Sequence, residues 1–103
     1  MKTIEIVPQA RAKLYDDLIR TQAEIRKRGR GTFYRDGRTS RSAAKWKHKA
    51  YAGSVSIARG TDGGVTAKIR TPPEREWQML SAFLGFVDRH LRDRIASIAI
   101  NYG

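Results

Sequence analysis

The sequence predicts an α+β fold, a two-layer sandwich in which an antiparallel-rich sheet carries two helices on one face. Three observations predict it. Several segments alternate apolar and polar side chains, as half-buried strands do. Two longer segments repeat apolar residues every three or four positions, as helices do, and a glycine-rich turn joins two of the strands. The expected order is β-α-β-β-β-α-β. With 103 residues the chain is expected to form one domain, 1–103.

The first two elements are a strand and a helix. Residues 2–7 alternate, with Ile4 and Ile6 on the inward side, and a proline ends the strand. An amphipathic pattern from Gln9 to about Arg28 then predicts a helix that turns its leucines toward the core.

The following segment, about 29–44, is predicted to be a basic mobile loop, because glycine, serine, threonine and arginine dominate it. A short strand at residues 32–35 is the only regular structure indicated there, and Phe33 is expected to anchor the loop. Basic loops of this length often become ordered on a polyanion.

Strands dominate the next part of the chain. Residues 45–50 alternate strictly between lysine and apolar or aromatic side chains. Residues 54–59 and 64–71 are expected to form a hairpin around the turn at 60–64, whose glycines tolerate positive φ. The alternation returns at residues 94–102, which are predicted to be the last strand.

The longest helix is expected over residues 71–91. Thr71 and Glu74 have the spacing of a capping box. The apolar surface is wider than one stripe, so this helix is expected to press into the core and against a second surface. Gly85 costs roughly 1 kcal/mol relative to alanine, which favours a close backbone approach. The two apolar rows are Trp77, Leu80, Leu84, Val87 and Leu91, and beside them Met79, Phe83, Phe86 and His90.

Positive charge is concentrated in one part of the chain. The formal net charge is +11. Residues 26–49 hold ten basic side chains and one acidic side chain, Asp36, which gives +9, whereas the other 79 residues carry only +2. An excess of this size indicates a polyanionic partner more than it indicates any fold.

The lysine-rich strand gives the sharpest functional expectation. Lys45, Lys47 and Lys49 share one face at spacings of roughly 7 Å, close to the distance between successive phosphates of a nucleic-acid strand, while Trp46 is expected in the core. Tyr34 and Tyr51 are candidates for stacking on bases. The residues expected to bind nucleic acid are Arg26, Lys27, Arg28, Arg30, Arg35, Arg38, Arg41, Lys45, Lys47, Lys49, Lys68 and Arg70.

The expected function is therefore non-sequence-specific binding of nucleic acid through phosphates, with RNA slightly favoured over DNA. One alternative is a homodimeric interaction module that associates through the 71–91 helix or a sheet edge. A second is a small toxin-type ribonuclease that uses His48 and Tyr51, although an enzyme is the less favoured class. The lysine row has a structural interpretation too, because lysines protect edge strands against unwanted pairing. An acidic protein or a membrane surface is a further alternative partner for the charge.

Other site classes receive little support. The chain has no cysteine, which excludes disulfides and thiolate metal sites, and its two histidines lack metal-ligand spacing. No catalytic residue, metal site or cofactor is expected. No apolar run approaches the roughly 20 residues of a membrane span, so we expect a cytoplasmic protein without membrane association.

The order of the predicted elements resembles that of double-stranded-RNA-binding domains, in which three strands lie between two helices. With the leading strand, it is also similar to the order in ribosome-binding hibernation factors. The second helix begins Pro72-Pro73-Glu74-Arg75-Glu76, without the lysine cluster that such RNA-binding domains present to phosphates. The resemblance is limited to element order and implies only a raised expectation of RNA.

Overall fold

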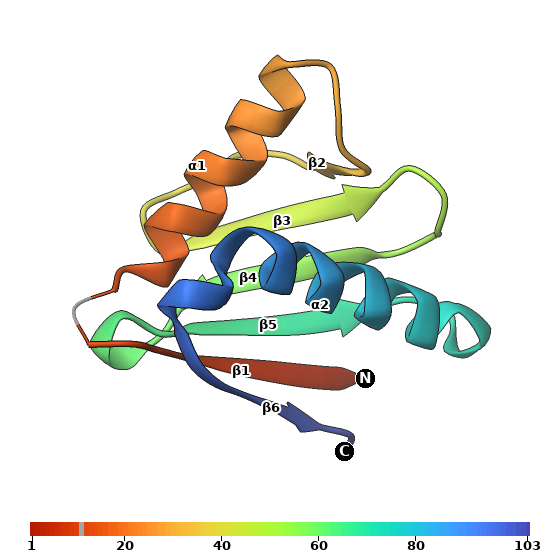
Figure 1. Cartoon of the computed structure of the whole chain (residues 1–103). Helices are drawn as coiled ribbons and strands as arrows, with labels where there is room; N and C mark the ends of the chain where they lie inside the picture. Colours follow the sequence, from red (N-terminus) through yellow and green to blue (C-terminus); the bar gives the residue numbers. More distant parts are fainter. Residues whose placement is uncertain (11) are drawn as a thin grey trace.

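The computed structural model describes residues 1–10 and 12–103. Within these ranges it contains one antiparallel sheet of six strands and two α-helices (Figure 1). The strands are β1 (Lys2–Pro8), β2 (Phe33–Arg35), β3 (Ala43–His48), β4 (Ser54–Arg59), β5 (Val65–Arg70) and β6 (Ile95–Asn101). The helices are α1 (Leu14–Lys27) and α2 (Glu76–Leu91), and short 3₁₀ turns lie at Thr61–Gly63, Pro73–Arg75 and Arg92–Arg94.

The sheet order is β2-β3-β4-β5-β1-β6, so the first strand lies between β5 and the last strand. Both helices cover the same face of this sheet (Figure 1). The predicted α+β fold is thereby confirmed, with one addition: β2 makes four strands, not three, between the helices. Neither helix in the described ranges is long and apolar enough to cross a membrane.

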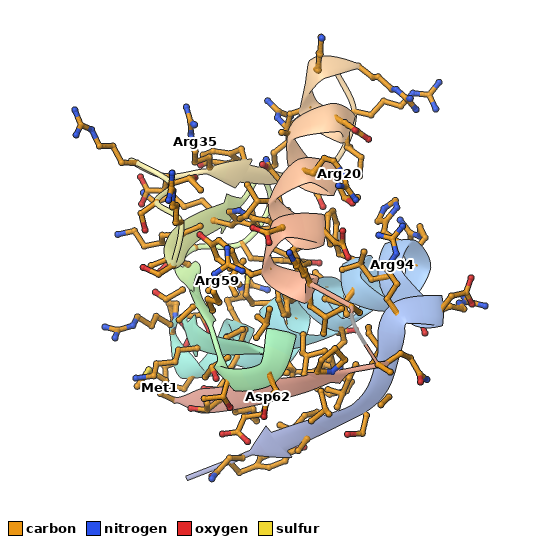
Figure 2. All side chains as sticks on the ribbon, turned by 90° about the vertical axis from the view of Figure 1, so that its left-hand side faces the viewer. Met1, Arg20, Arg35, Arg59, Asp62 and Arg94 are labelled. Atoms are coloured by element: carbon orange, nitrogen blue, oxygen red, sulfur yellow. The ribbon has the colours of Figure 1, made fainter. Side chains whose placement is uncertain are left out.

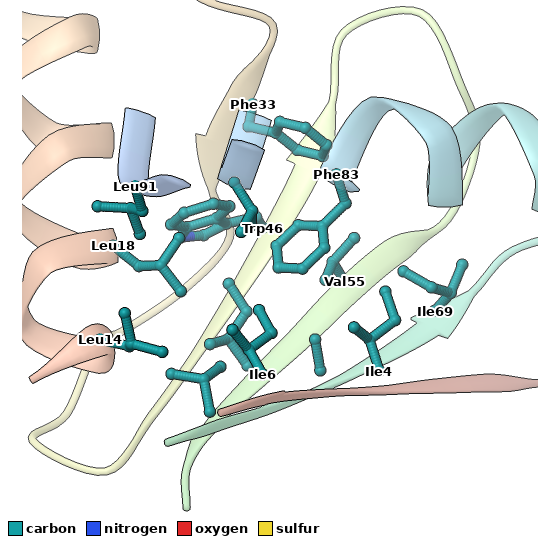
Figure 3. Packing of buried hydrophobic residues seen from close by; sticks show 14 of the residues in the cluster. Ile4, Ile6, Leu14, Leu18, Phe33, Trp46, Val55, Ile69, Phe83 and Leu91 are labelled. Atoms are coloured by element: carbon teal, nitrogen blue, oxygen red, sulfur yellow. The ribbon is translucent and has the colours of Figure 1, made fainter. Parts of the chain in front are cut away.

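The core lies between the helices and the inner face of the sheet (Figure 3). Trp46 of β3 is fully buried, and its ring centroid lies 5.3–6.2 Å from those of Phe33, Phe83 and Phe86. Phe33 is also buried, as expected for the residue that anchors its segment. Isoleucines of β1 and leucines of α1 complete the cluster, so the alternation in the sequence located the core correctly.

The predicted start of α1 is wrong. The helix begins at Leu14, because Gln9 still belongs to the sheet edge: its amide donates to the carbonyl of Arg94 over 2.7 Å. The Gln9 side chain donates to the carbonyl of Ile95 as well. Lys13 at the helix start provides no side-chain cap. The predicted helix also covered residue 11, which lies outside the described residues.

The predicted capping box is also wrong. The Thr71 hydroxyl oxygen is buried without a hydrogen-bond partner in the described structure, and α2 begins only at Glu76. Pro72 has the extended conformation, φ −54° and ψ 141°, because a residue before proline disfavours the helical region. The Pro72-Pro73 pair therefore delays the helix, and Pro73–Arg75 form a 3₁₀ turn in between.

The inward face of α2 is narrower than the two predicted rows. Met79, Leu80, Phe83, Val87 and Leu91 are buried, whereas Trp77 is 64% exposed. Leu84 and Phe86 are half-buried. The close backbone approach expected at Gly85 is absent, because no atom lies within 4 Å of a Cβ built there.

The segment 29–44 contains β2 and a tight turn. Ser40 organises this turn: its hydroxyl oxygen accepts hydrogen bonds from the amides of Ser42 and Ala43, and its carbonyl accepts one from the Tyr15 hydroxyl of α1. Arg59 of β4 adds a guanidinium contact to the carbonyl of Arg41. The mobility expected for this segment stays a prediction.

Candidate nucleic-acid interface

The candidate site is on the face of the sheet that the helices leave uncovered, and β3 is its clearest part. Ala44, Trp46 and His48 are buried against the helices, while Lys45 and Lys47 are exposed. This is the alternation that the sequence predicts for the strand. Figure 2 shows nitrogen-tipped side chains projecting from the side of the sheet opposite the helices.

The strand register brings a second pair of cations onto this face. Lys45 lies opposite Ser56 of β4, and Ser56 lies opposite Lys68 of β5. Arg70 of β5 lies opposite Ser54. Neighbouring strands are about 4.8 Å apart, so the cations of β3 and β5 stand roughly 10 Å apart across the short serine side chains.

Arg38, from the turn before β3, completes the group. It lines the same shallow hollow of about 480 Å³ as Lys45, Lys68 and Arg70. We call Arg38, Lys45, Lys47, Lys68 and Arg70 the basic sheet face. The floor of the hollow is made of small side chains, among them Ala43, Ser56, Ala58 and Thr66. Small residues here leave a polyanion free to approach the sheet closely.

Asp36 is part of this face too, and no pattern in the sequence indicates its role. Its carboxylate lies 3.3 Å from the Lys45 ammonium and 3.8 Å from the Lys47 ammonium. The Asp36 amide donates to the Lys45 carbonyl, so the pairing of β2 with β3 continues for one residue and fixes its position. All three side chains are at least 31% exposed, and ion pairs of this kind contribute little to stability. Asp36 therefore spaces the two lysines and partly neutralises them.

Four of the other nine acidic side chains, Asp16, Asp17, Glu76 and Asp88, make ion pairs in the described structure. Arg59 binds Asp16 through two nitrogens, at 2.7 and 3.2 Å, and this contact holds the pKa of Asp16 below its usual range. Asp17 contacts Arg20 and Arg94. The Glu76 carboxylate accepts a hydrogen bond from Lys2, which lowers its pKa. These ion pairs neutralise Lys2, Arg20, Arg59, Arg92 and Arg94, all of which lie outside the basic sheet face.

The remaining predicted residues do not join this face. Arg26, Lys27, Arg28 and Arg30 lie at the carboxyl end of α1 and in the loop after it, in the helix layer. Arg35 pairs in register with Trp46 and lies on the edge strand. Lys49 follows the end of β3 and is exposed, and Arg41 lies in the turn organised by Ser40. The single basic surface expected from the sequence is therefore divided between the two layers.

The two candidate stacking residues have different surroundings. Tyr34 pairs in register with Lys47, so it shares the outer face with the lysines, and it is half-buried. Tyr51 stacks on His48, with centroids 4.5 Å apart, and packs against the core. His48 is buried, its Nδ1 accepts the Ala50 amide over 2.9 Å, and burial lowers its pKa. These contacts make His48 and Tyr51 packing residues on the inner side.

The fold and site define a small α+β domain with one uncovered, cationic sheet face. No family model matches the chain, and no curated protein or solved structure matches it significantly. Within the described ranges, no group of three histidine, aspartate or glutamate side chains is placed to hold a metal ion.

Proposed function

We propose that this protein binds nucleic acid, RNA in preference to DNA, through phosphate contacts made by the basic sheet face. One observation carries the proposal: five exposed cations from three segments converge on one shallow, small-residue surface. Phosphate backbones are recognised by arrays of Lys and Arg of this kind, without base-specific contacts.

The position of β3 in the sheet favours phosphate binding over edge protection as the role of its lysines. Lysines are used on edge strands to discourage pairing with other chains. β3 is an interior strand, because it pairs with β2 on one side and with β4 on the other. Edge protection therefore does not account for Lys45 and Lys47.

The shape of the surface favours an extended ligand. The cations are spread over β3, β5 and the turn at Arg38, with spacings of roughly 7 and 10 Å, too far apart to close around one small anion. In the described structure no helix projects from this face to enter a duplex groove. Sheet faces that carry aromatic residues suit single strands, and the half-buried Tyr34 beside Lys47 supplies one. We therefore favour single-stranded RNA.

The test is a fluorescence-anisotropy titration with single-stranded RNA, duplex RNA and duplex DNA at several salt concentrations. The triple variant Lys45→Ser, Lys47→Ser, Lys68→Ser is expected to bind on the order of 10–100-fold more weakly at low salt. It is also expected to flatten the log–log salt slope by about 2, since about 0.7 is lost per contact to a single strand.

The matched control removes the same charge from the helix side of the molecule. Lys13→Ser, Arg20→Ser, Arg92→Ser changes three exposed residues, and it is expected to reduce affinity by less than about 3-fold through net charge alone. Equal losses in the two triple variants would reject a localised site. No binding by the wild type at low salt would reject the proposed function itself.

A second candidate function, self-association, rests on the opposite end of the sheet. The large apolar side chains exposed in the described structure are Met1, Val7, Trp77, Ile98 and Tyr102. All but Trp77 belong to β1 and β6 or lie just beyond their ends. Among the described residues no strand pairs with the outer edge of β6, and residues 95–103 carry no charged side chain. Edge strands usually carry charge that discourages pairing.

We therefore propose that two copies pair antiparallel through β6. A neutral strand avoids like-charge repulsion between copies that each carry +11, and a twofold axis at Ile98 places apolar residues opposite each other. Light scattering during size exclusion is expected to give a dimer for the wild type. Ile98→Lys should give a monomer, and Ala23→Lys on the exposed side of α1 should remain dimeric. A monomeric wild type at high micromolar concentration would reject this candidate.

A further inference from the structure

A second hollow, separate from the basic sheet face, lies in the helix layer between the end of α1 and the side of α2. Its volume is about 600 Å³, within the range of roughly 300–1,000 Å³ that is common for small-molecule sites. Residues from α1, the loop before β2, and α2 line it together. Those used below are Ile25, Arg28, Arg30, Phe86, Arg89 and His90.

One wall of the hollow is apolar and aromatic. Ile25 and Phe86 are half-buried, and the His90 ring lies 4.8 Å from the Phe86 ring, tilted by 55°. The pKa of His90 lies below its ordinary value, mainly because the ring is partly desolvated and to a smaller extent because Arg89 is positively charged. Aromatic side chains of this kind offer stacking surfaces for a nucleobase.

Three arginines surround this wall. Arg28 and Arg30 come from the end of α1 and the loop, and Arg89 comes from α2. All three are exposed, and none makes an ion pair with an acidic side chain of the described residues. Guanidinium groups bind phosphate through paired, charge-assisted hydrogen bonds. The hollow therefore combines a flat apolar wall with unneutralised positive charge.

Gly85 is an independent observation that points to a ligand. Glycine in the middle of a helix costs roughly 1 kcal/mol relative to alanine, yet packing does not require it here, because a Cβ would have no atom within 4 Å. Gly85 lines the hollow, and its missing side chain widens it. Gly31 has a packing reason by contrast: its φ is +89°, and a Cβ there would lie 2.7 Å from Ile25.

We propose that this hollow binds a nucleotide, with the base against Phe86 and His90 and the phosphate on Arg28, Arg30 and Arg89. The nucleotide is either free or part of a single strand. Only the second source, a nucleotide within a bound strand, depends on the proposed function. Phe33 of β2 lines the hollow, and β2 is the edge strand that pairs with β3. Arg35 on β2 is exposed, so a strand held by the basic sheet face has a cationic path around this edge.

The first experiment titrates the full chain with adenosine 5′-monophosphate by isothermal calorimetry, with adenosine and inorganic phosphate as partial ligands. Gly85→Leu fills the hollow and improves helix propensity, so it should fold normally and bind the nucleotide at least 10-fold more weakly. Gly85→Ala has the same helix benefit with little added volume and should bind within about 3-fold of the wild type. Arg28→Gln with Arg89→Gln should weaken the monophosphate but not adenosine.

The second experiment identifies the source of the nucleotide and separates the two proposals. Single-stranded RNA is titrated against Gly85→Leu and against the triple lysine variant of the basic sheet face. If Gly85→Leu weakens RNA at least 3-fold, the hollow takes a nucleotide of the strand. If it weakens only the monophosphate, the hollow takes a free nucleotide. The triple lysine variant should retain monophosphate binding whether or not it loses RNA.

Two results would overturn the inference. One is a Gly85→Leu variant, folded by circular dichroism, whose affinities for the monophosphate and for RNA equal those of the wild type. The other is monophosphate binding that the triple lysine variant abolishes, which would place the nucleotide on the basic sheet face. Loss of RNA binding by the triple lysine variant with no response to Gly85→Leu would leave the proposed function intact while rejecting the hollow.

Discussion

Strand β3 has two faces that differ as much as any two regions of the molecule. Toward the helices it places Trp46, which is fully buried, and His48, which is 9% exposed. Toward solvent it places Lys45 and Lys47 around Asp36. The two sets alternate residue by residue along one backbone. We therefore expect stability and charge to be separable here, with substitutions tolerated on the outer face and destabilising on the inner one.

The largest effect is expected on the inner face. Trp46→Ala removes a fully buried ring that contacts Phe33, Phe83 and Phe86. It should lower the free energy of unfolding by about 3–5 kcal/mol, measured by urea denaturation followed by circular dichroism. Trp77→Ala is the control, because that side chain is 64% exposed, and it should cost less than about 0.5 kcal/mol. Similar losses for both would contradict the assigned core.

We expect a residue of the inner face, His48, to make stability depend on pH. Burial lowers the pKa of His48 in the folded state, and its Nδ1 accepts a hydrogen bond that protonation would break. In the unfolded chain His48 has the ordinary histidine pKa of about 6.5, so below that pH the unfolded state binds more protons than the folded state. The contribution of His48 to stability is therefore complete above that pH and is lost as the pH falls. Urea midpoints from pH 7.5 to 5.5 should show this fall.

The matched variants for this experiment are His48→Gln and His90→Gln, because the pKa of His90 is also lowered. We expect His48→Gln to remove the larger share of the pH dependence and the double variant to remove nearly all of it. An unchanged pH profile in the double variant would assign the effect to other groups.

The smallest effect is expected on the outer face. Asp36→Asn removes the one carboxylate that contacts Lys45 and Lys47. It should strengthen RNA binding by about 2–5-fold, the equivalent of an exposed ion pair, with stability nearly unchanged. Asp88→Asn neutralises an acid paired with Arg92 in the helix layer and should have less effect. Weaker binding by Asp36→Asn would show that Asp36 positions the lysines more than it competes with phosphate.

Much of the fold follows from local patterns in the sequence. The period-two alternation of β1, β3 and β5 identified the buried side of each strand, and the glycine-rich turn at 60–64 identified the hairpin. At Gly63 φ is +81°, and a Cβ would lie 2.3 Å from the Ala12 carbonyl oxygen. The alternation and the positive φ are local requirements, so the sequence displays them directly, whereas the approach to Ala12 is a contact between distant segments.

What the sequence did not predict depends on contacts between distant segments. The late start of α1 accompanies hydrogen bonds from Gln9 to the carbonyls of Arg94 and Ile95, at the start of β6. The place of Asp36 between two lysines depends on the pairing of β2 with β3; the pattern indicates the short strand at residues 32–35, but not its partner strand. One residue in the sequence, Gly85, relates to the hollow beside α2, but a glycine in a helix predicts a close backbone approach and not a hollow.

The same distinction applies to the candidate site. Alternation along the strands placed Lys45, Lys47, Lys68 and Arg70 on one exposed face, whereas charge density along the chain pointed to residues 26–49. Charge density also grouped the arginines at the end of α1 with them. Proximity in sequence does not show which layer a helix end occupies, and these arginines belong to the other layer.

The insertion of β1 between β5 and β6 has a consequence for biosynthesis. β1 is synthesised before the other strands of this sheet, yet one of its edges pairs with β5 and the other with β6. Until β6 emerges from the ribosome, the edge of β1 that pairs with it stays open. Such non-local pairing slows folding and exposes the nascent chain to association, so chaperone dependence should respond to translation speed over the codons between β5 and β6.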